Sequence, residues 1–413
     1  MTGTSPAERP RRHLAFLPYP SYGHTMPVIA VLSELVARGH RVTCFASEEF
    51  AERVRATGAE VRLYEPPLST ASPPEVIDAD ESARSALRLL ESSTAVMPAI
   101  EAAFADGPPD AVVYDTTLWL TGRLLAAGWE RPRVQVSPTF ISNEHFNLSD
   151  ECNEFAGEID PKHPALAEFA ARLTELVTGS GLPEEAQAEL FHGHEEFTVA
   201  FLPKEFQFSA GTFDARHAFV GPTVGQRRED HAWTPPADGR PVLLVSLGTT
   251  IHGRPDFFRD CARAFADSPW HVVMALGSRV DPADLGPLPP NVEAHSWVPL
   301  SAVLAHTSVF LCQSGMGSIM ESLHKGVPMV VVPHHPEQKV NAKRLAQLGL
   351  AETVRPEDAS VEALQAAVTR VCEDSGMRER AQEMRRHIHA AGGAARAADV
   401  IEDRLSTRSL EHS

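Results

Sequence analysis

The chain of 413 residues has few cysteines, and its apolar residues form no long run. The five cysteines, at positions 44, 152, 261, 312 and 372, lack the C-x-x-C spacing of zinc and redox sites and are typical of free thiols in the cytoplasm. No apolar run reaches the length of ~18 residues that a membrane helix needs. The basic residues 9–12 lead into only four apolar residues before prolines interrupt, which favours a strand over a signal peptide. We therefore expect a cytoplasmic protein without a membrane span.

Basic residues are also scarce. The chain has 37 Lys and Arg against 55 Asp and Glu, a formal net charge of −18. Nucleic acids and anionic membranes both require a positive surface, so this balance argues against either as a partner. A neutral or hydrophobic small molecule is the partner that it favours. Apolar residues make up 43% of the chain, enough for two or three domains with their own cores.

Strand-like and helix-like segments alternate through most of the chain, which predicts an α/β fold with two doubly wound, Rossmann-like domains. One series opens at residues 13–17 and a second at 241–247. Between them lies a charged segment rich in Pro and Gly, as expected of a linker. The predicted parts are a first domain (1–220) with a helical insertion (about 143–200), a linker (221–240), a second domain (241–385) and a C-terminal helix (386–408).

Two residues at predicted strand ends form a candidate catalytic pair. His24 follows the first strand, and Asp115 ends the apolar strand 109–115. Because the carboxyl ends of parallel strands meet at one edge of a sheet, Asp115 could accept a hydrogen bond from the His24 ring. The carboxylate would fix the tautomer while the other ring nitrogen removes a proton from a hydroxyl. The alternative is that both residues only cap helices.

A glycine-containing loop follows the apolar run 309–311 and predicts a diphosphate site. Gly315 and Gly317 remove side chains where a backbone must approach a ligand, and Ser318 can cap the following helix. Free N–H groups at that helix start, together with the helix dipole, would stabilise a diphosphate.

Residues on either side of this loop complete a predicted nucleotide-sugar site. Glu321 lies one turn into the helix and is suited to accept hydrogen bonds from ribose hydroxyls, while Trp297 could stack on the base. His334 and His335 are adjacent and have no third ligand, so we interpret them as ordinary loop residues. The sequence shows no plausible metal cluster, and no metal or other cofactor is expected.

Taken together, these residues resemble the family 1 glycosyltransferases of the GT-B fold, in particular the bacterial macrolide glycosyltransferases. The resemblance covers nearly the whole chain, including Ser246 to Thr249 and the pair Gly392-Gly393 before the last helix. It implies two Rossmann-like domains that face a cleft, with the acceptor bound mainly by the first and the nucleotide sugar mainly by the second. It also implies a last helix that crosses back to the first domain.

The resemblance implies a role for each matching residue. His24 would be the general base and Asp115 its partner. The donor site would use Gly248, Thr249, Gln313, Gly315, Met316, Gly317 and Ser318 around the diphosphate, Trp297 and Val298 at the base, Glu321 at the ribose, and Glu337 with Gln338 at the sugar hydroxyls.

The sequence departs from the family's usual pattern at two positions. Gln313 stands where the family usually has a His that contacts the diphosphate, and Gln keeps a neutral N–H donor but cannot become cationic. A loss of ~1–2 kcal/mol of leaving-group stabilisation would slow the reaction about tenfold, so we expect activity to survive. Leu300 stands where relatives commonly carry Gln, which removes one expected contact with the base.

The predicted activity is inverting transfer of a hexose from a nucleotide sugar to a hydroxyl of a small hydrophobic natural product, such as a macrolide or another polyketide. Glu337 and Gln338 suggest a sugar with its ring hydroxyls intact, so UDP-glucose is the favoured donor and TDP-sugars come second. Two alternatives are a non-hydrolysing nucleotide-sugar epimerase and a non-catalytic nucleotide-sugar-binding partner. We expect a monomer or a homodimer.

Overall fold

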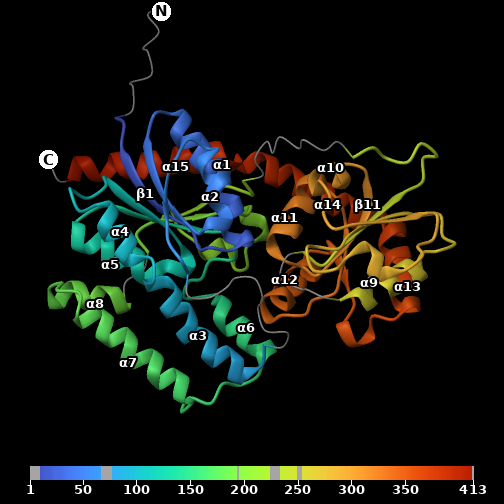
Figure 1. The fold of residues 1–413 in the computed structure, drawn as a ribbon, viewed down its shortest axis with the longest axis horizontal. Helices are drawn as coiled ribbons and strands as arrows, with labels where there is room; N and C mark the ends of the chain where they lie inside the picture. Colours follow the sequence, from blue (N-terminus) through green and yellow to red (C-terminus); the bar gives the residue numbers. More distant parts are fainter. Residues whose placement is uncertain (1–9, 67–76, 193–194, 224–232, 249–253, 412–413) are drawn as a thin grey trace, which may run out of the picture.

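The computed structural model describes residues 10–66, 77–192, 195–223, 233–248 and 254–411. The chain forms two α/β domains, each built on a fully parallel sheet, and Figure 1 shows the two domains side by side. The predicted fold class is thereby confirmed. None of the helices among the described residues is long and apolar enough to cross a membrane.

The first domain contains a seven-stranded sheet with the order β3-β2-β1-β4-β5-β6-β7. Alternate residues of each strand point to opposite faces of the sheet, and both faces are covered by apolar side chains. The strands are β1 (His13–Leu17), β2 (Arg41–Ala46), β3 (Glu60–Leu63), β4 (Ala111–Asp115), β5 (Arg133–Ser137), β6 (Thr198–Ala200) and β7 (His217–Phe219). The helices are α1 (Tyr22–Ala37), α2 (Glu48–Arg55), α3 (Ala79–Thr94), α4 (Met97–Ala103), α5 (Trp119–Trp129), α6 (Leu148–Ala156), α7 (Pro164–Thr178) and α8 (Glu184–His192).

The predicted helical insertion is too long at its C-terminal end. Helices α6 to α8 lie within it, but Thr198–Ala200 forms strand β6, which pairs with β5 and belongs to the sheet. The strand has only three residues, too few to show the alternation that identifies a strand in a sequence. The insertion therefore ends before residue 198.

The second domain contains a six-stranded sheet with the order β10-β9-β8-β11-β12-β13. The described residues between β7 and β8, which belong to the predicted linker, form no helix or strand. The strands are β8 (Val242–Ser246), β9 (His271–Ala275), β10 (Val292–His295), β11 (Thr307–Cys312), β12 (Met329–Val331) and β13 (Ala351–Thr353). The helices are α9 (Pro255–Ala264), α10 (Leu300–Leu304), α11 (Met316–Lys325), α12 (Pro336–Gln347), α13 (Val361–Glu373), α14 (Ser375–Ala391) and α15 (Gly393–Glu411).

The last helix begins later than predicted. Residues 386–391 complete α14, and the chain breaks at Gly392 and Gly393, whose φ angles of 95° and 60° lie in the left-handed region that glycine adopts most easily. Helix α15 therefore starts at Gly393 and packs against α1 of the first domain, as Figure 1 shows. The Gly393 N–H donates to the Val220 carbonyl (2.7 Å), so the two places where the chain passes between the domains lie side by side.

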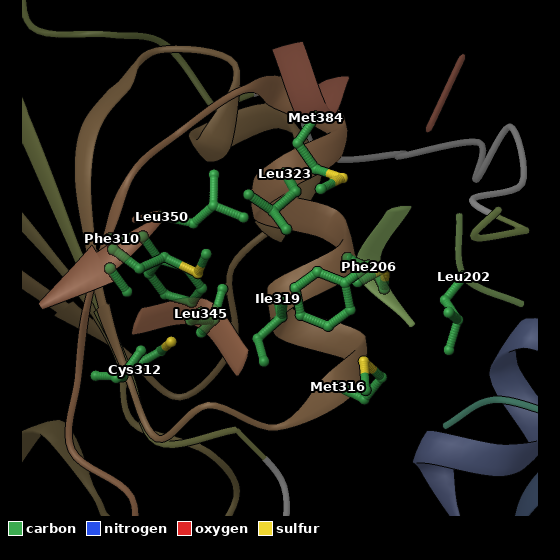
Figure 2. Packing of buried hydrophobic residues seen from close by; sticks show 14 of the residues in the cluster. Leu202, Phe206, Phe310, Cys312, Met316, Ile319, Leu323, Leu345, Leu350 and Met384 are labelled. Atoms are coloured by element: carbon green, nitrogen blue, oxygen red, sulfur yellow. The ribbon is translucent and has the colours of Figure 1, made fainter. Parts of the chain in front are cut away.

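An apolar cluster joins the two domains. It contains Phe140 and Phe206 of the first domain together with residues of α11 and α12. Figure 2 shows Phe206 beside Ile319 and near Met316 of α11. Arg344 of α12 adds polar contacts across the same boundary, because its guanidinium donates to the carbonyls of three consecutive residues, 205–207. These contacts fix the second domain against the loop that follows β6.

A buried ion cluster fixes α15 to the first domain, and we expect its loss to destabilise the protein. Glu402 is 5% exposed and bonds both Arg38 (2.8 Å) and His40 (2.8 Å). Replacing Glu402 with Ala leaves both partners without this carboxylate and should lower the free energy of unfolding by about 3 kcal/mol. The control is Asp399→Ala, which removes the 41% exposed partner of the same Arg38 and should cost less than about 1 kcal/mol. Equal effects of the two changes in chemical denaturation would contradict this account.

Candidate active site

The structure brings His24 and Asp115 into direct contact. Strand β1 pairs in parallel with β4, so the two residues lie at neighbouring strand ends although 91 positions separate them. His24 is in the first turn of α1, which begins at Tyr22, and its Nδ1 lies 2.8 Å from Asp115 Oδ2. Since a carboxylate accepts, Nδ1 carries the proton and Nε2 has the free lone pair. This is the arrangement that a general base requires.

The surroundings make the Asp115 carboxylate a fixed partner. Its side chain is fully buried, whereas the His24 side chain is 24% exposed. The second oxygen, Oδ1, accepts from the backbone N–H of Thr117 (2.8 Å), so Asp115 also caps the short helix η1 (Thr116–Leu118). The capping interpretation of Asp115 is therefore confirmed, and the same carboxylate is also placed to act as the partner of His24.

The charge around His24 favours its protonated form. Burial lowers its pKa, but the charge and hydrogen bond of Asp115 and the charge of Glu337 raise it, and the result lies above the ordinary value of 6.5. The ring of Tyr19 packs edge-on against the imidazole, with 5.4 Å between ring centroids. His24 is thus oriented on one side by a carboxylate and on the other by an aromatic ring.

The predicted diphosphate loop lies at the N-terminus of α11. Gly315 is the N-cap residue and Met316 the first residue of the helix, so Ser318 lies within the first turn and the prediction that it caps the helix is wrong. Met316 points into the apolar core, while Gly317 is exposed. The first-turn N–H groups have no partner within the helix and form a ready anion site.

Gln313 lies between the two glycine loops of the second domain. Strands β8 and β11 are neighbours in register, which places Gly248 next to Gln313. A Cβ atom on Gly248, whose φ is +65°, would lie 2.5 Å from Gln313 Nε2, and one on Gly315 would lie 3.5 Å from it. The amide of Gln313 therefore occupies the place where a donor to the diphosphate is expected. Thr249 lies outside the described residues.

Helix α12 is attached to this loop through Ser314. Ser314 has a left-handed φ of 62°, which is rare for a residue with a side chain, and its Oγ donates to the Gln338 carbonyl (2.7 Å). In return, Asn341 Nδ2 donates to the Ser314 carbonyl (2.8 Å). The diphosphate loop and the start of α12 thus form one rigid unit.

The two residues predicted at the sugar hydroxyls lie in different environments. Gln338 is buried, and its Oε1 accepts from the backbone N–H groups of His334 (2.9 Å) and His335 (3.1 Å), so this oxygen shapes the loop. Glu337 is exposed, and its Oε1 accepts from Thr139 Oγ1 of the first domain (3.2 Å). The charge of Glu337 also acts on His24, so the candidate base and the candidate sugar site face each other across the domain boundary.

The remaining predicted donor residues surround the same loop. Trp297 follows β10 and is 61% exposed, although most tryptophans are largely buried, which suits a surface on which a base stacks. Val298 is 6% exposed and packs in the interdomain cluster, so its side chain is part of the core. Glu321 lies on α11, one turn beyond Gly317.

A cavity of about 420 Å³ opens in the first domain. Thr116, next in the chain to Asp115, and Thr139, which contacts Glu337, both line it. Phe140 lines the cavity, whereas Phe146 packs in the core and Phe155 is exposed on α6. The sequence analysis did not identify Thr139, although it lies just after the end of β5 much as Asp115 lies at the end of β4.

Comparison with known proteins gives the family. A family profile described as "Erythromycin biosynthesis protein CIII-like, C-terminal domain" matches residues 264–402. The chain is 37% identical to the demethyllactenocin mycarosyltransferase of Streptomyces fradiae, over 95% of this chain and 87% of that protein. It is 34% identical to the oleandomycin glycosyltransferase of Streptomyces antibioticus, over 98% of this chain and 93% of that protein.

A solved structure agrees with these relatives. The crystal structure of the calicheamicin glycosyltransferase CalG4 matches with a TM-score of 0.87 and 42% identity, over 96% of this chain and 98% of that one. The chain is a family 1 glycosyltransferase of the GT-B type. With this assignment, a nucleotide-sugar epimerase and a non-catalytic binding partner are no longer alternatives for the function of the chain. A nucleotide-sugar donor and a small-molecule acceptor follow from it.

Among the described residues of the glycosyltransferase, no group of three or more His, Cys, Asp or Glu side chains is placed to hold a metal ion.

We expect Trp297 to contribute to nucleotide binding. Stacking of a base on an aromatic ring contributes ~1–3 kcal/mol, so Trp297→Ala should raise the dissociation constant for UDP about tenfold or more in calorimetry. Leu63→Ala, which shortens a 47% exposed apolar side chain of the first domain, should leave UDP binding unchanged. Equal UDP affinity of the Trp297→Ala variant and the wild type would rule out stacking at this position.

Proposed function

We propose that this glycosyltransferase moves a hexose to a hydroxyl of a small natural product with inversion at the anomeric carbon, and that His24 is the general base. The observation that carries the proposal is the 2.8 Å bond between His24 Nδ1 and the buried Asp115 carboxylate. It leaves Nε2 to take the proton of the acceptor hydroxyl, and the imidazolium that forms lies beside a negative charge.

The donor side supplies the leaving group. The acceptor oxygen would attack the anomeric carbon in line, and the nucleoside diphosphate would depart toward the first turn of α11, where backbone N–H groups and the Gln313 amide stabilise its charge. A single displacement inverts the anomeric carbon. Because neutral donors and the helix dipole supply the stabilisation, the proposed reaction uses no metal ion.

The acceptor proposal rests on the cavity and on the relatives. The cavity lies in the first domain, is lined by Thr116 next in the chain to Asp115, and at about 420 Å³ has the size of a small-molecule site. The names of the relatives refer to demethyllactenocin, oleandomycin and calicheamicin. We therefore propose a macrolide or another complex natural product as acceptor.

For the donor we propose UDP-glucose, because Glu337 lies at the boundary where sugar hydroxyls would be bound. A TDP-deoxysugar is the second candidate. Gln338 Oε1 already accepts hydrogen bonds from the backbone, which leaves one fewer acceptor for sugar hydroxyls and favours this candidate. The mycarosyltransferase among the relatives favours it as well.

The role of His24 predicts both a mutational effect and a pH dependence. His24→Ala should lower kcat about 10²–10⁴-fold. The base must be neutral to accept a proton and its pKa is raised, so kcat should fall as pH drops through an apparent pKa above 6.5. Glu337→Gln removes one of the charges that raise this pKa and should move the fall to lower pH.

The matched control is His163→Ala, which removes the histidine of an exposed His–Asp pair, with Asp80, at 2.9 Å. It should leave both kcat and the pH profile unchanged. Full turnover by the His24→Ala variant would refute the proposed mechanism.

Gln313 provides a test of the donor side. His at this position could become cationic beside the leaving diphosphate, so Gln313→His should raise kcat about tenfold or change the ratio of activity with UDP-glucose to that with TDP-deoxysugars. Gln347→His, at an exposed position of α12, is the control for the same change of residue type. If neither turnover nor the donor ratio changes, position 313 contributes little to phosphate binding.

A further inference from the structure

The cavity in the first domain is lined mostly by polar side chains. Small-molecule sites are usually lined by apolar and aromatic residues with a few polar groups. Here the proportion is reversed, because only four of the nineteen lining residues, Trp119, Phe140, Ile141 and Leu148, are apolar. All nineteen belong to the first domain. A purely hydrophobic acceptor would displace water from these polar groups and would offer no hydrogen bonds beyond those that they already make with one another, at a cost in binding free energy.

One wall of the cavity is a preformed network around Glu195. The carboxylate accepts from Tyr114 Oη (2.5 Å), Arg123 Nε (2.8 Å) and Gln135 Nε2 (3.1 Å). Glu195 and Arg123 are 11% and 12% exposed, and Gln135 is 8% exposed. Burial and the charge of Glu195 raise the pKa of Tyr114 well above its ordinary value, so the phenol stays a neutral donor. These groups are held rigidly in place before any ligand arrives.

Another wall of the cavity comes from the start of β7 and the segment before it. Asp214 pairs with both Arg216 (2.9 Å) and His217 (3.0 Å), and Asn143 donates to Thr212 Oγ1 (2.8 Å). The lining of the cavity therefore includes carboxylate, guanidinium, amide and hydroxyl groups. Trp119, over whose ring the Arg123 guanidinium lies at 5.3 Å, adds an aromatic surface.

We propose that this cavity binds a sugar that the acceptor already carries. Each sugar hydroxyl both donates and accepts, and the planar carboxylate, amide and guanidinium groups of the two walls match that requirement, while Trp119 can cover the apolar face of the sugar ring. The inference rests on the proposed function. It makes the acceptor a glycoside with an apolar aglycone part, so another glycosyl transfer must precede the reaction of this enzyme.

The test compares matched acceptors that differ in one sugar. A macrolactone, a flavonoid and an anthracyclinone would each be assayed with UDP-glucose and TDP-deoxysugars as the free aglycone and as its monoglycoside. We expect a KM about tenfold or more lower for the glycoside in at least one pair, as two or more hydrogen bonds to charged groups would give. A KM for every aglycone equal to or below that of its glycoside would overturn the inference.

A variant separates the cavity from the catalytic pair. Arg216→Ala should raise KM for the preferred glycoside about tenfold, with little change in kcat or in the KM for the matched aglycone. Arg240→Ala is a closely matched control, because Arg240 pairs with Asp238 two positions away at 2.9 Å and is similarly exposed, 46% against 49% for Arg216. Equal effects on glycoside and aglycone would contradict a sugar site.

The two proposals fail in different ways. Transfer to aglycones alone would leave the proposed function intact and remove the sugar site. If no acceptor is glycosylated, the proposed function fails for these substrates. Calorimetry of the same acceptor pairs without donor then tests whether the cavity binds a sugar. Tighter binding of the glycosides supports the sugar site, and equal or weaker binding refutes it.

Discussion

The register between β1 and β4 is the constraint on which the catalytic half of the site depends. Parallel pairing in register brings the residue that ends β4 to the start of the helix that follows β1, and His24 and Asp115 occupy those two places. The same rule acts in the second domain, where β8 and β11 bring Gly248 and Gln313 together. In each half of the site, the order of the strands brings the residues together. Local hydrogen bonds then orient the side chains, as the N–H of Thr117 does for Asp115.

The two halves become one site because the domains share a core. The apolar cluster around Phe206 and α11 packs the two domains against each other, and Thr139 of the first domain also contacts Glu337 of the second. Helix α12 has a double role, since it carries Glu337 at its first turn and is bonded to the diphosphate loop through Ser314 and Asn341. The candidate residues for the sugar and for the diphosphate are therefore held together in one rigid unit.

The sequence was sufficient for the features that depend on local pattern. Apolar runs, glycine loops and strand-end polar residues predicted both sheets and most of the residues that the structure gathers at the cleft. Other features depend on partners far away in the chain. Strand β6 has three residues and is defined by its pairing with β5, and Gln338 has its oxygen directed to the backbone. The polar cavity was beyond prediction for the same reason, because Tyr114, Arg123 and Glu195 come from three separate segments.

The two passages of the chain between the domains, at Val220 and at Gly393, are joined by a hydrogen bond of 2.7 Å. Because both connections leave the first domain side by side, rotation about this place is the relative movement of the domains that the connections favour. Glycines with left-handed φ lie on both passages, Gly221 on one and Gly392 with Gly393 on the other, and they are the residues best able to absorb a change in backbone angle. Helix α15 would travel with the first domain and α14 with the second. Gly392 and Gly393 are therefore the positions at which we expect the backbone angles to change when the domains move relative to each other.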